Sequence, residues 1–220
     1  MLTEKRALIA GFVAAGAALI LFAWLSSAVL EGGVTRFDLS VRDAIHTWAS
    51  PALTSVMRLV TELGEVYFLV SVGVLLVWRL AASGRRHAAL LLVLAVAGAE
   101  ALDQILKVVF QRPRPPAFFG LAQPETYSFP SGHALVATVF YGVVAAVFAA
   151  REPSRGRRIA LWTMAAVAAV VIGFSRVYLG VHHPSDVLAG YAGAVVWVAG
   201  VGAGYQTWLR RARSRCKRPP

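Results

Sequence analysis

The sequence predicts an all-α integral membrane protein with six transmembrane helices and a short interfacial helical segment between the first two. Three observations predict this class. Hydrophobic residues make up 58% of the 220 residues and charged residues only 15%, whereas a soluble domain carries about 25% charged residues. Apolar runs long enough to cross a bilayer recur along the chain. Basic residues gather between alternate runs.

Four uncharged runs predict spans directly, because crossing the hydrocarbon takes about 17–25 residues. They contain 24, 17, 17 and 23 residues, at positions 7–30, 134–150, 159–175 and 187–209. Two further apolar segments carry charges, among them Arg79 in one and Glu100 in the other. The predicted domain covers residues 1–210, followed by a basic cytoplasmic tail, 211–220, and its spans are about 7–30, 66–80, 87–110, 133–150, 159–175 and 185–209.

The segment between the first two spans, residues 31–65, predicts two further helices. Phe37, Val41, Ile45 and Trp48 recur at three- and four-residue steps with charged residues between them, a pattern typical of an amphipathic helix. Ser50-Pro51 predicts a break before a second helix over 52–63. The pair either lies in the membrane plane beside a lipid entrance or is a connector resting on the membrane.

The net charge of +11 reflects membrane topology rather than nucleic-acid binding. With six spans, 15 of the 22 Lys and Arg residues fall on the side of the two termini, against only Glu4 and Glu152 of the 11 acids. Basic segments stay in the cytoplasm, so we expect both termini there, in a bacterial inner membrane. Lys107, Arg114 and Arg176 then lie near the opposite face and need another explanation.

The most polar stretch lies between the last two spans. It reads Ser175-Arg176, five residues, His182, three residues, Asp186. Pro184 suits the first turn of a helix, which places Asp186 one turn after His182, within reach of its ring. An imidazole with an orienting carboxylate is typical of an activated nucleophile or base. By itself, the stretch is equally compatible with a solvated interfacial loop.

Two further clusters lie at the same membrane level. Asp103 and Lys107 share a helix face at i,i+4 spacing, and Pro residues after position 110 end that helix, leaving Arg114 on extended backbone. The tetrapeptide Pro130-Ser-Gly-His133 opens the next helix. A helix N-terminus with free N–H groups and a glycine is suited to bind an anion, although an ordinary helix cap followed by an unrelated His has the same form.

Together the three clusters resemble the signature of the type 2 phosphatidic acid phosphatase (PAP2) superfamily. The matching parts are Lys107, six residues, Arg114-Pro115; then Pro130-Ser-Gly-His133; then Ser175-Arg176, five residues, His182, three residues, Asp186. Identity, spacing and order all match. The six-span layout resembles the membrane-bound lipid phosphatases of this family, so that the resemblance covers about residues 1–210.

The resemblance implies a role for each matching residue. His182 attacks phosphorus and becomes a phosphohistidine, and Asp186 orients its ring. His133 protonates the leaving oxygen and then activates water. The phosphoryl oxygens are held by Lys107, Arg114, Ser131, Gly132 and Arg176. Asp103 supports Lys107. No metal and no cofactor is implied, and a metal site at His133, His182, His183 and Asp186 is disfavoured because the three neighbouring cations repel metal ions.

The expected reaction is hydrolysis of a lipid phosphate, drawn from the bilayer, at the outer face of the membrane. Undecaprenyl diphosphate ranks first as substrate, followed by phosphatidic acid and phosphatidylglycerophosphate. A phosphotransferase on the same scaffold is an alternative, and a lipid-binding or transport protein is the non-enzyme alternative. The polar residues gather at one rim rather than at mid-membrane, which disfavours a transporter. The sequence leaves the oligomeric state open.

Overall fold

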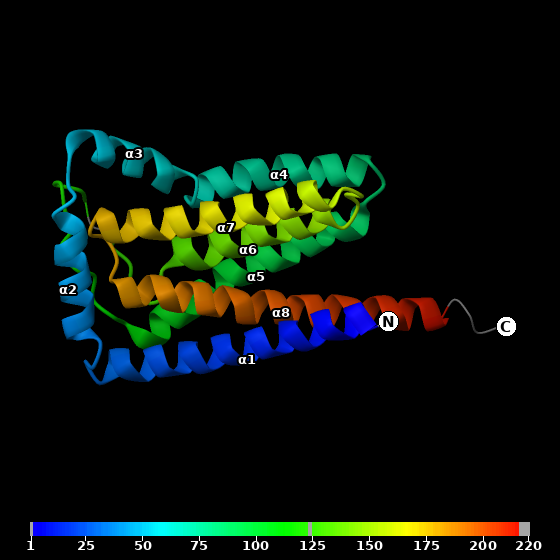
Figure 1. Cartoon of the computed structure of the whole chain (residues 1–220), viewed down its shortest axis with the longest axis horizontal. Coiled ribbons are helices and arrows are strands. Elements are labelled where there is room, and N and C mark those ends of the chain that lie inside the picture. Colours follow the sequence, from blue (N-terminus) through cyan, green and yellow to red (C-terminus); the bar gives the residue numbers. More distant parts are fainter. Residues whose placement is uncertain (1, 123–124, 216–220) are drawn as a thin grey trace.

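The computed structural model describes residues 2–122 and 125–215, and every regular element in that part of the chain is an α-helix (Figure 1). Most of these helices run roughly parallel in one elongated bundle, and one short helix lies across its end. The elements are α1 (Leu2–Leu30), α2 (Thr35–His46), α3 (Pro51–Glu62), α4 (Val66–Ala82), α5 (Arg86–Phe110), α6 (Gly132–Ala149), α7 (Arg155–Tyr178) and α8 (Pro184–Arg215).

The helices long and apolar enough to cross a membrane number five among the described residues. They are α1, α5, α6, α7 and α8. A sixth span results if α3 and α4 count as one, because together they pass the same test and are bent by 47° at the short break between them. The expected span 66–80 corresponds to α4, while α7 is longer than the expected 159–175 at both ends.

Local sequence accounts for the helix ends that matter for the site. At the end of α5, Gln111 takes a left-handed conformation with φ of 47°, and its N–H donates to the carbonyl of Lys107. The prolines that follow cannot continue a helix. At the start of α3, the Ser50 side chain accepts a hydrogen bond from Leu53 N, and Pro51 occupies the first turn, as the Ser-Pro pair predicted.

Helix α6 forms the centre of the bundle and packs against α5, α7 and α8. Leu135, Val139 and Phe140 are at most 2% exposed in its core. Small residues permit the close approach of α8: a Cβ on Gly190 would lie 2.8 Å from the carbonyl oxygen of Ser131. Such close backbone contacts are common between membrane helices, and here they fix the start of α6 against the start of α8.

The two ends of the bundle differ in character. The ends of the described chain and the short α4–α5 and α6–α7 turns lie at one end (Figure 1). Helix α2 and the α5–α6 and α7–α8 connections lie at the other. Of the expected tail, residues 211–215 continue α8 and residues 216–220 lie outside the described part.

Helix α2 is amphipathic, but it turns charged residues inward. Asp38 and Arg42 are buried at 0% and 5% exposure, while the apolar side chains of Phe37 and Leu39 are 45% and 48% exposed. The Arg42 guanidinium donates to the backbone carbonyls of Pro116 and Gly180. Helix α2 is therefore bonded to both connections at this end of the bundle.

Candidate active site

A polar cavity of about 180 Å³ lies at the end of the bundle that α2 crosses. Seven of the predicted site residues line it, and they come from α5, α6, α7 and the connections between helices. They are Asp103, Lys107, Arg114, Gly132, His133, Arg176 and His182. Three cationic side chains and two imidazoles therefore face one small space.

His182 is held between a carboxylate and a guanidinium. Its ring is 1% exposed, with Nδ1 3.4 Å from Oδ2 of Asp186 and Nε2 3.0 Å from an Arg114 nitrogen. Pro184 begins α8, so that Asp186 lies one turn after His182, as the spacing predicted. Burial lowers the pKa of His182 well below its usual value, and the charge of Arg114 lowers it further. The imidazole is therefore neutral at pH 7, and its Nε2 lone pair faces the Arg114 guanidinium.

Arg114 is fixed by the connections on both sides of the cavity. Its Nε donates to the carbonyl of Thr126 at 2.7 Å, and another nitrogen donates to the Thr126 hydroxyl. A third contact, 3.0 Å long, reaches the carbonyl of Val181. The Arg114 guanidinium is thus held in a fixed position beside His182 Nε2, where an anionic oxygen would bind.

Lys107 is oriented by Asp103 one turn earlier on α5. Their side chains form a buried ion pair of 2.5 Å. The start of α6 packs directly against this pair: a Cβ on Gly132 would lie 2.8 Å from Asp103 Oδ2 and 3.1 Å from Lys107 Nζ. Glycine is therefore required for the pair to approach the N-terminus of α6.

His133 and Arg176 have partners that sequence reasoning missed. His133 Nε2 lies 3.1 Å from Oε1 of Glu65, which is located at the break between α3 and α4. Arg176 donates to the Thr61 hydroxyl at 2.7 Å and lies 3.9 Å from the same Glu65 oxygen. Glu65 marked only a span boundary in the sequence, and no local spacing connects it to His133.

Ser131 lies outside the cavity lining. Its side chain is fully buried, and its amide donates to the Asp186 carbonyl. The first intrahelical bond of α6 runs from Leu135 N to Ser131 O, so the amides of Gly132, His133 and Ala134 precede the helical ladder. These amides supply the positive end of α6 beside the cavity.

Behind Asp186 lies a second buried carboxylate, which the sequence did not single out. Arg112 donates to Asp186 Oδ1 with one nitrogen and to Asp38 Oδ2 with another, at 2.5 and 2.7 Å. The six-residue spacing of the signature from Lys107 fits Arg114 and does not fit Arg112. The structure gives it a different position, on the far side of Asp186 from His182.

His183 belongs to this rear layer as well. Its backbone N–H donates to Asp186 Oδ2. Burial lowers the pKa of its imidazole to about 4, with the charge of Arg112 contributing. No group of three or more His, Cys, Asp or Glu side chains in residues 2–122 and 125–215 is arranged to hold a metal ion.

Comparison with known proteins agrees with this geometry. A sequence model of the PAP2 superfamily matches residues 88–210, which include every site residue named from the signature. The chain belongs to the PAP2 superfamily. It is therefore an enzyme, a PAP2-type phosphatase that hydrolyses phosphate esters, and an integral membrane protein.

Relatives of this PAP2 phosphatase carry different substrate names. Phosphatidylglycerophosphatase B from Bacillus subtilis is 32% identical over 175 residues, covering 79% of this chain and 85% of the relative. Undecaprenyl-diphosphatase from Sulfolobus acidocaldarius is 30% identical over 181 residues, covering 79% and 82%. The crystal structure of a transmembrane PAP2-type phosphatidylglycerolphosphate phosphatase from Bacillus subtilis superposes with a TM-score of 0.81 at 29% identity, covering 88% of this chain and 96% of that one.

Proposed function

We propose that this PAP2 phosphatase removes phosphate from a membrane lipid through a phosphohistidine intermediate on His182, without a metal ion. The observation that carries the proposal is the convergence of Lys107, Arg114 and Arg176 on one cavity with two imidazoles. Phosphoryl transfer depends mainly on positioning and on stabilising the charge of the phosphoryl oxygens. Three fixed cations and the amides of α6 supply that stabilisation.

In the first step, the lone pair of His182 Nε2 attacks phosphorus. The bond from phosphorus to the leaving oxygen breaks, and His133 donates its Nε2 proton to that oxygen. Asp186 accepts the Nδ1–H of His182 and stabilises the ring as it gains positive charge. Lys107, Arg114 and Arg176 hold the three phosphoryl oxygens while Asp103 keeps the Lys107 ammonium in place.

In the second step, water replaces the leaving group. His133, now neutral, takes a proton from the water, whose oxygen attacks phosphorus. The P–N bond breaks, its electron pair returns to His182 Nε2, and inorganic phosphate leaves. Of the predicted phosphate ligands, Gly132 acts through its amide. The Ser131 hydroxyl is buried outside the cavity lining and has no hydrogen-bond partner among the described residues.

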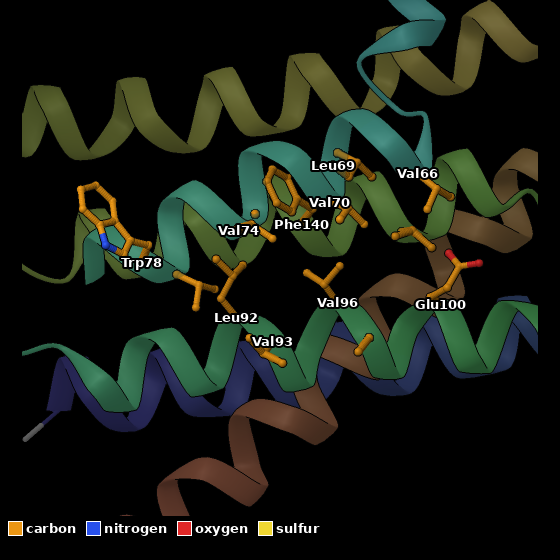
Figure 2. A pocket seen from close by; sticks show the side chains of 14 residues that line it. Val66, Leu69, Val70, Val74, Trp78, Leu92, Val93, Val96, Glu100 and Phe140 are labelled. Carbon is orange, nitrogen blue, oxygen red and sulfur yellow. The ribbon is translucent and has the colours of Figure 1, made fainter. Parts of the chain in front are cut away.

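We place the lipid chain in an apolar groove between α4 and α5, which Figure 2 shows. The groove has a volume of about 580 Å³ and shares Val66, Glu100 and Val136 with the polar cavity. Figure 2 shows Glu100 near one end, beside Val66, and Trp78 near the other. Several lining side chains are more than half exposed, so that a lipid enters sideways from the bilayer while its phosphate reaches His182.

The distribution of charge supports the proposed orientation. The end of the bundle opposite the cavity carries seven arginines in its turns and in the adjoining helix ends. They are Arg79, Arg85, Arg86, Arg151, Arg155, Arg157 and Arg158. Basic turns stay on the cytoplasmic side. This supports a six-span topology, with α3 and α4 as one bent span, cytoplasmic termini and a site that faces the exterior or periplasm.

Undecaprenyl diphosphate is the first proposed substrate, and phosphatidylglycerophosphate is the second. Each is supported by a relative of that name, at 30% and 32% identity respectively. Phosphatidic acid has the same phosphomonoester and fits the same groove. A phosphotransferase would use the same phosphohistidine and pass the phosphoryl group to an alcohol instead of water, and a silent lipid-binding protein would do neither.

The experiment is phosphate release by the purified protein in detergent, with excess EDTA. The substrates are undecaprenyl diphosphate, phosphatidic acid, phosphatidylglycerophosphate and glucose 6-phosphate. We expect release from one lipid, unchanged by EDTA and lowered at least about 10³-fold in His182→Ala. Loss of release on adding EDTA, or undiminished turnover by His182→Ala, would overturn the proposal.

A further inference from the structure

The carboxylate behind His182 is itself held by a charged network that reaches α2. Asp38 is 0% exposed. Its Oδ1 accepts the backbone N–H of Ser185 at 2.9 Å, and its Oδ2 accepts the Ser185 hydroxyl at 2.6 Å and an Arg112 nitrogen at 2.7 Å. Arg112 also donates to the Ser185 hydroxyl and to Asp186. One guanidinium thus bridges two buried carboxylates.

The network fixes the first turn of α8, which carries Asp186. The N–H groups of a first turn have no partner within the helix, and here the Ser185 N–H is satisfied by Asp38 from another helix. Asp186 reaches back to the His183 N–H at 2.9 Å, as an acid at the third helical position does in a capping box. Both oxygens of Asp186 are therefore committed, Oδ1 to Arg112 and Oδ2 to the two histidines.

Because this network is buried, the interactions between its charges are strong. Removing one partner of a buried ion pair leaves an uncompensated charge, which is strongly unfavourable. Without Asp38, the full charge of Arg112 would act on Asp186 and weaken its attraction for the positive ring that forms on His182. With Asp38 present, Arg112 can align Asp186 without neutralising it.

Resting on the proposed function, we infer that Asp38 and Arg112 are positioning residues for phosphoryl transfer, which together hold Asp186 aligned behind His182. In the part of the chain that the structure describes, neither residue lines the phosphate cavity. Both therefore act through Asp186. Through Asp38, helix α2 contributes to catalysis, a role that its amphipathic sequence pattern did not indicate.

Charged and titratable groups surround the His182–Asp186 pair on every packed element. They are Asp38 and Arg42 on α2, Glu65 at the break between α3 and α4, Asp103 and Lys107 on α5, Arg112 and Arg114 on the α5–α6 connection, His133 on α6, Arg176 on α7, and His183 on the α7–α8 connection. Changing one member while the others stay in place isolates its electrostatic contribution to the pH dependence.

The test is the pH–rate profile of Asp38→Asn and Arg112→Gln. The nucleophile must be neutral, so the acid limb reports protonation of His182. Losing the negative charge of Asp38 disfavours protonation and moves this limb to lower pH, whereas losing the positive charge of Arg112 moves it to higher pH. We expect shifts on the order of one pH unit. We expect kcat to fall about tenfold, less than for a residue that transfers the proton, at nearly constant KM.

Two further variants separate positioning from stability. Ser185→Ala removes hydroxyl contacts to Asp38 and Arg112 without changing any charge, so we expect a lower Tm and an unmoved acid limb. Glu152→Gln removes an acid paired with Arg157 in the α6–α7 turn and is expected to match the wild type. If Arg112→Gln does not fold, Arg112→Lys keeps the charge and should show the wild-type acid limb with a lower kcat.

The outcomes distinguish this inference from the function on which it rests. If the wild type forms a phosphohistidine but the two acid limbs stay in place or move the same way, Asp38 and Arg112 are not electrostatic positioning residues. If the wild type forms no phosphohistidine while hydrolysing lipid, the proposed mechanism fails first. The inference is supported if the acid limbs of Asp38→Asn and Arg112→Gln move in opposite directions while Glu152→Gln behaves like the wild type.

Discussion

At the residue scale, the protonation of His182 governs the reaction. A base with a lowered pKa stays neutral to lower pH than a free imidazole, so lowering the pH from 7 to the usual histidine value of about 6.5 leaves the nucleophile intact. We predict that kcat/KM shows no loss attributable to His182 until well below pH 6.5. A kcat/KM profile between pH 4 and 9 measures this, because kcat/KM reports the groups of the free enzyme.

A variant of Arg114 tests the same pH profile by changing the charge beside His182. Arg114→Gln removes a charge 3.0 Å from His182 Nε2, and loss of this cation raises the pKa of His182. Its acid limb should move to higher pH, and its kcat/KM should fall about 10²-fold because a ligand to the phosphoryl oxygens is lost. An acid limb identical to that of the wild type would contradict the electrostatic account of His182.

At the same scale, sequence reasoning singled out the residues of the three motifs and missed the partners that helix packing brings to them. Lys107, Arg114 and His182 belong to motifs with fixed local spacing. Asp38 and Ser185, by contrast, are 147 positions apart, and Glu65 and His133 are 68 apart. Such pairs are created by helix packing, and nothing in the neighbouring sequence marks them.

At the scale of elements, the approach of α6 to α5 sets the position of the ammonium of Lys107. In Gly132→Ala, the added methyl group meets the flexible ends of Asp103 and Lys107 rather than backbone, so the helix forms but the ion pair shifts. We predict a loss of at least about tenfold in kcat/KM. The assay is lipid phosphate release.

The matched control lies in the same helix. A Cβ on Gly142 meets nothing within 4 Å, so Gly142→Ala should keep wild-type activity, with unchanged or slightly higher stability because alanine favours the helix. Equal activities of the Gly132 and Gly142 variants would show that the close approach of α6 is not needed for catalysis.

Element boundaries were predictable where the sequence carries explicit signals. Ser50-Pro51 predicted the start of α3, and the prolines after Phe110 predicted the end of α5. The orientation of α2 was not predictable from its pattern, because charged residues in an amphipathic helix face either solvent or buried partners. The partner of Asp38 lies on α8, at the far end of the chain.

At the scale of the whole molecule, the groove between α4 and α5 connects the bilayer with the phosphate cavity. We predict that Gly73→Trp, which fills this groove, lowers kcat/KM for a long-chain lipid at least about tenfold and changes that for a short-chain soluble phosphate less than about twofold. Val167→Trp, in a separate groove beside α7, is the control. Equal losses with both substrates would exclude the groove as the chain site.

The class of fold was predictable because membrane insertion leaves a strong sequence signal in the length of the apolar runs. The number of spans was harder, since α4 alone is short and the bend at residues 63–65 makes the sixth span depend on α3. The substrate was not predictable, because the groove accepts hydrocarbon and the cavity accepts phosphate, features that all the candidate lipids share.

The measurement that tests the central claim most directly is rapid-quench trapping of the phosphoenzyme. Wild-type protein is mixed with ³²P-labelled lipid phosphate and quenched in alkali within milliseconds. We predict a phosphoryl group on His182 that is stable to alkali and labile to acid, and no trapped label in His182→Ala at equal Tm. Label on another residue, or full lipid turnover without any phosphohistidine at the earliest times, would contradict the mechanism.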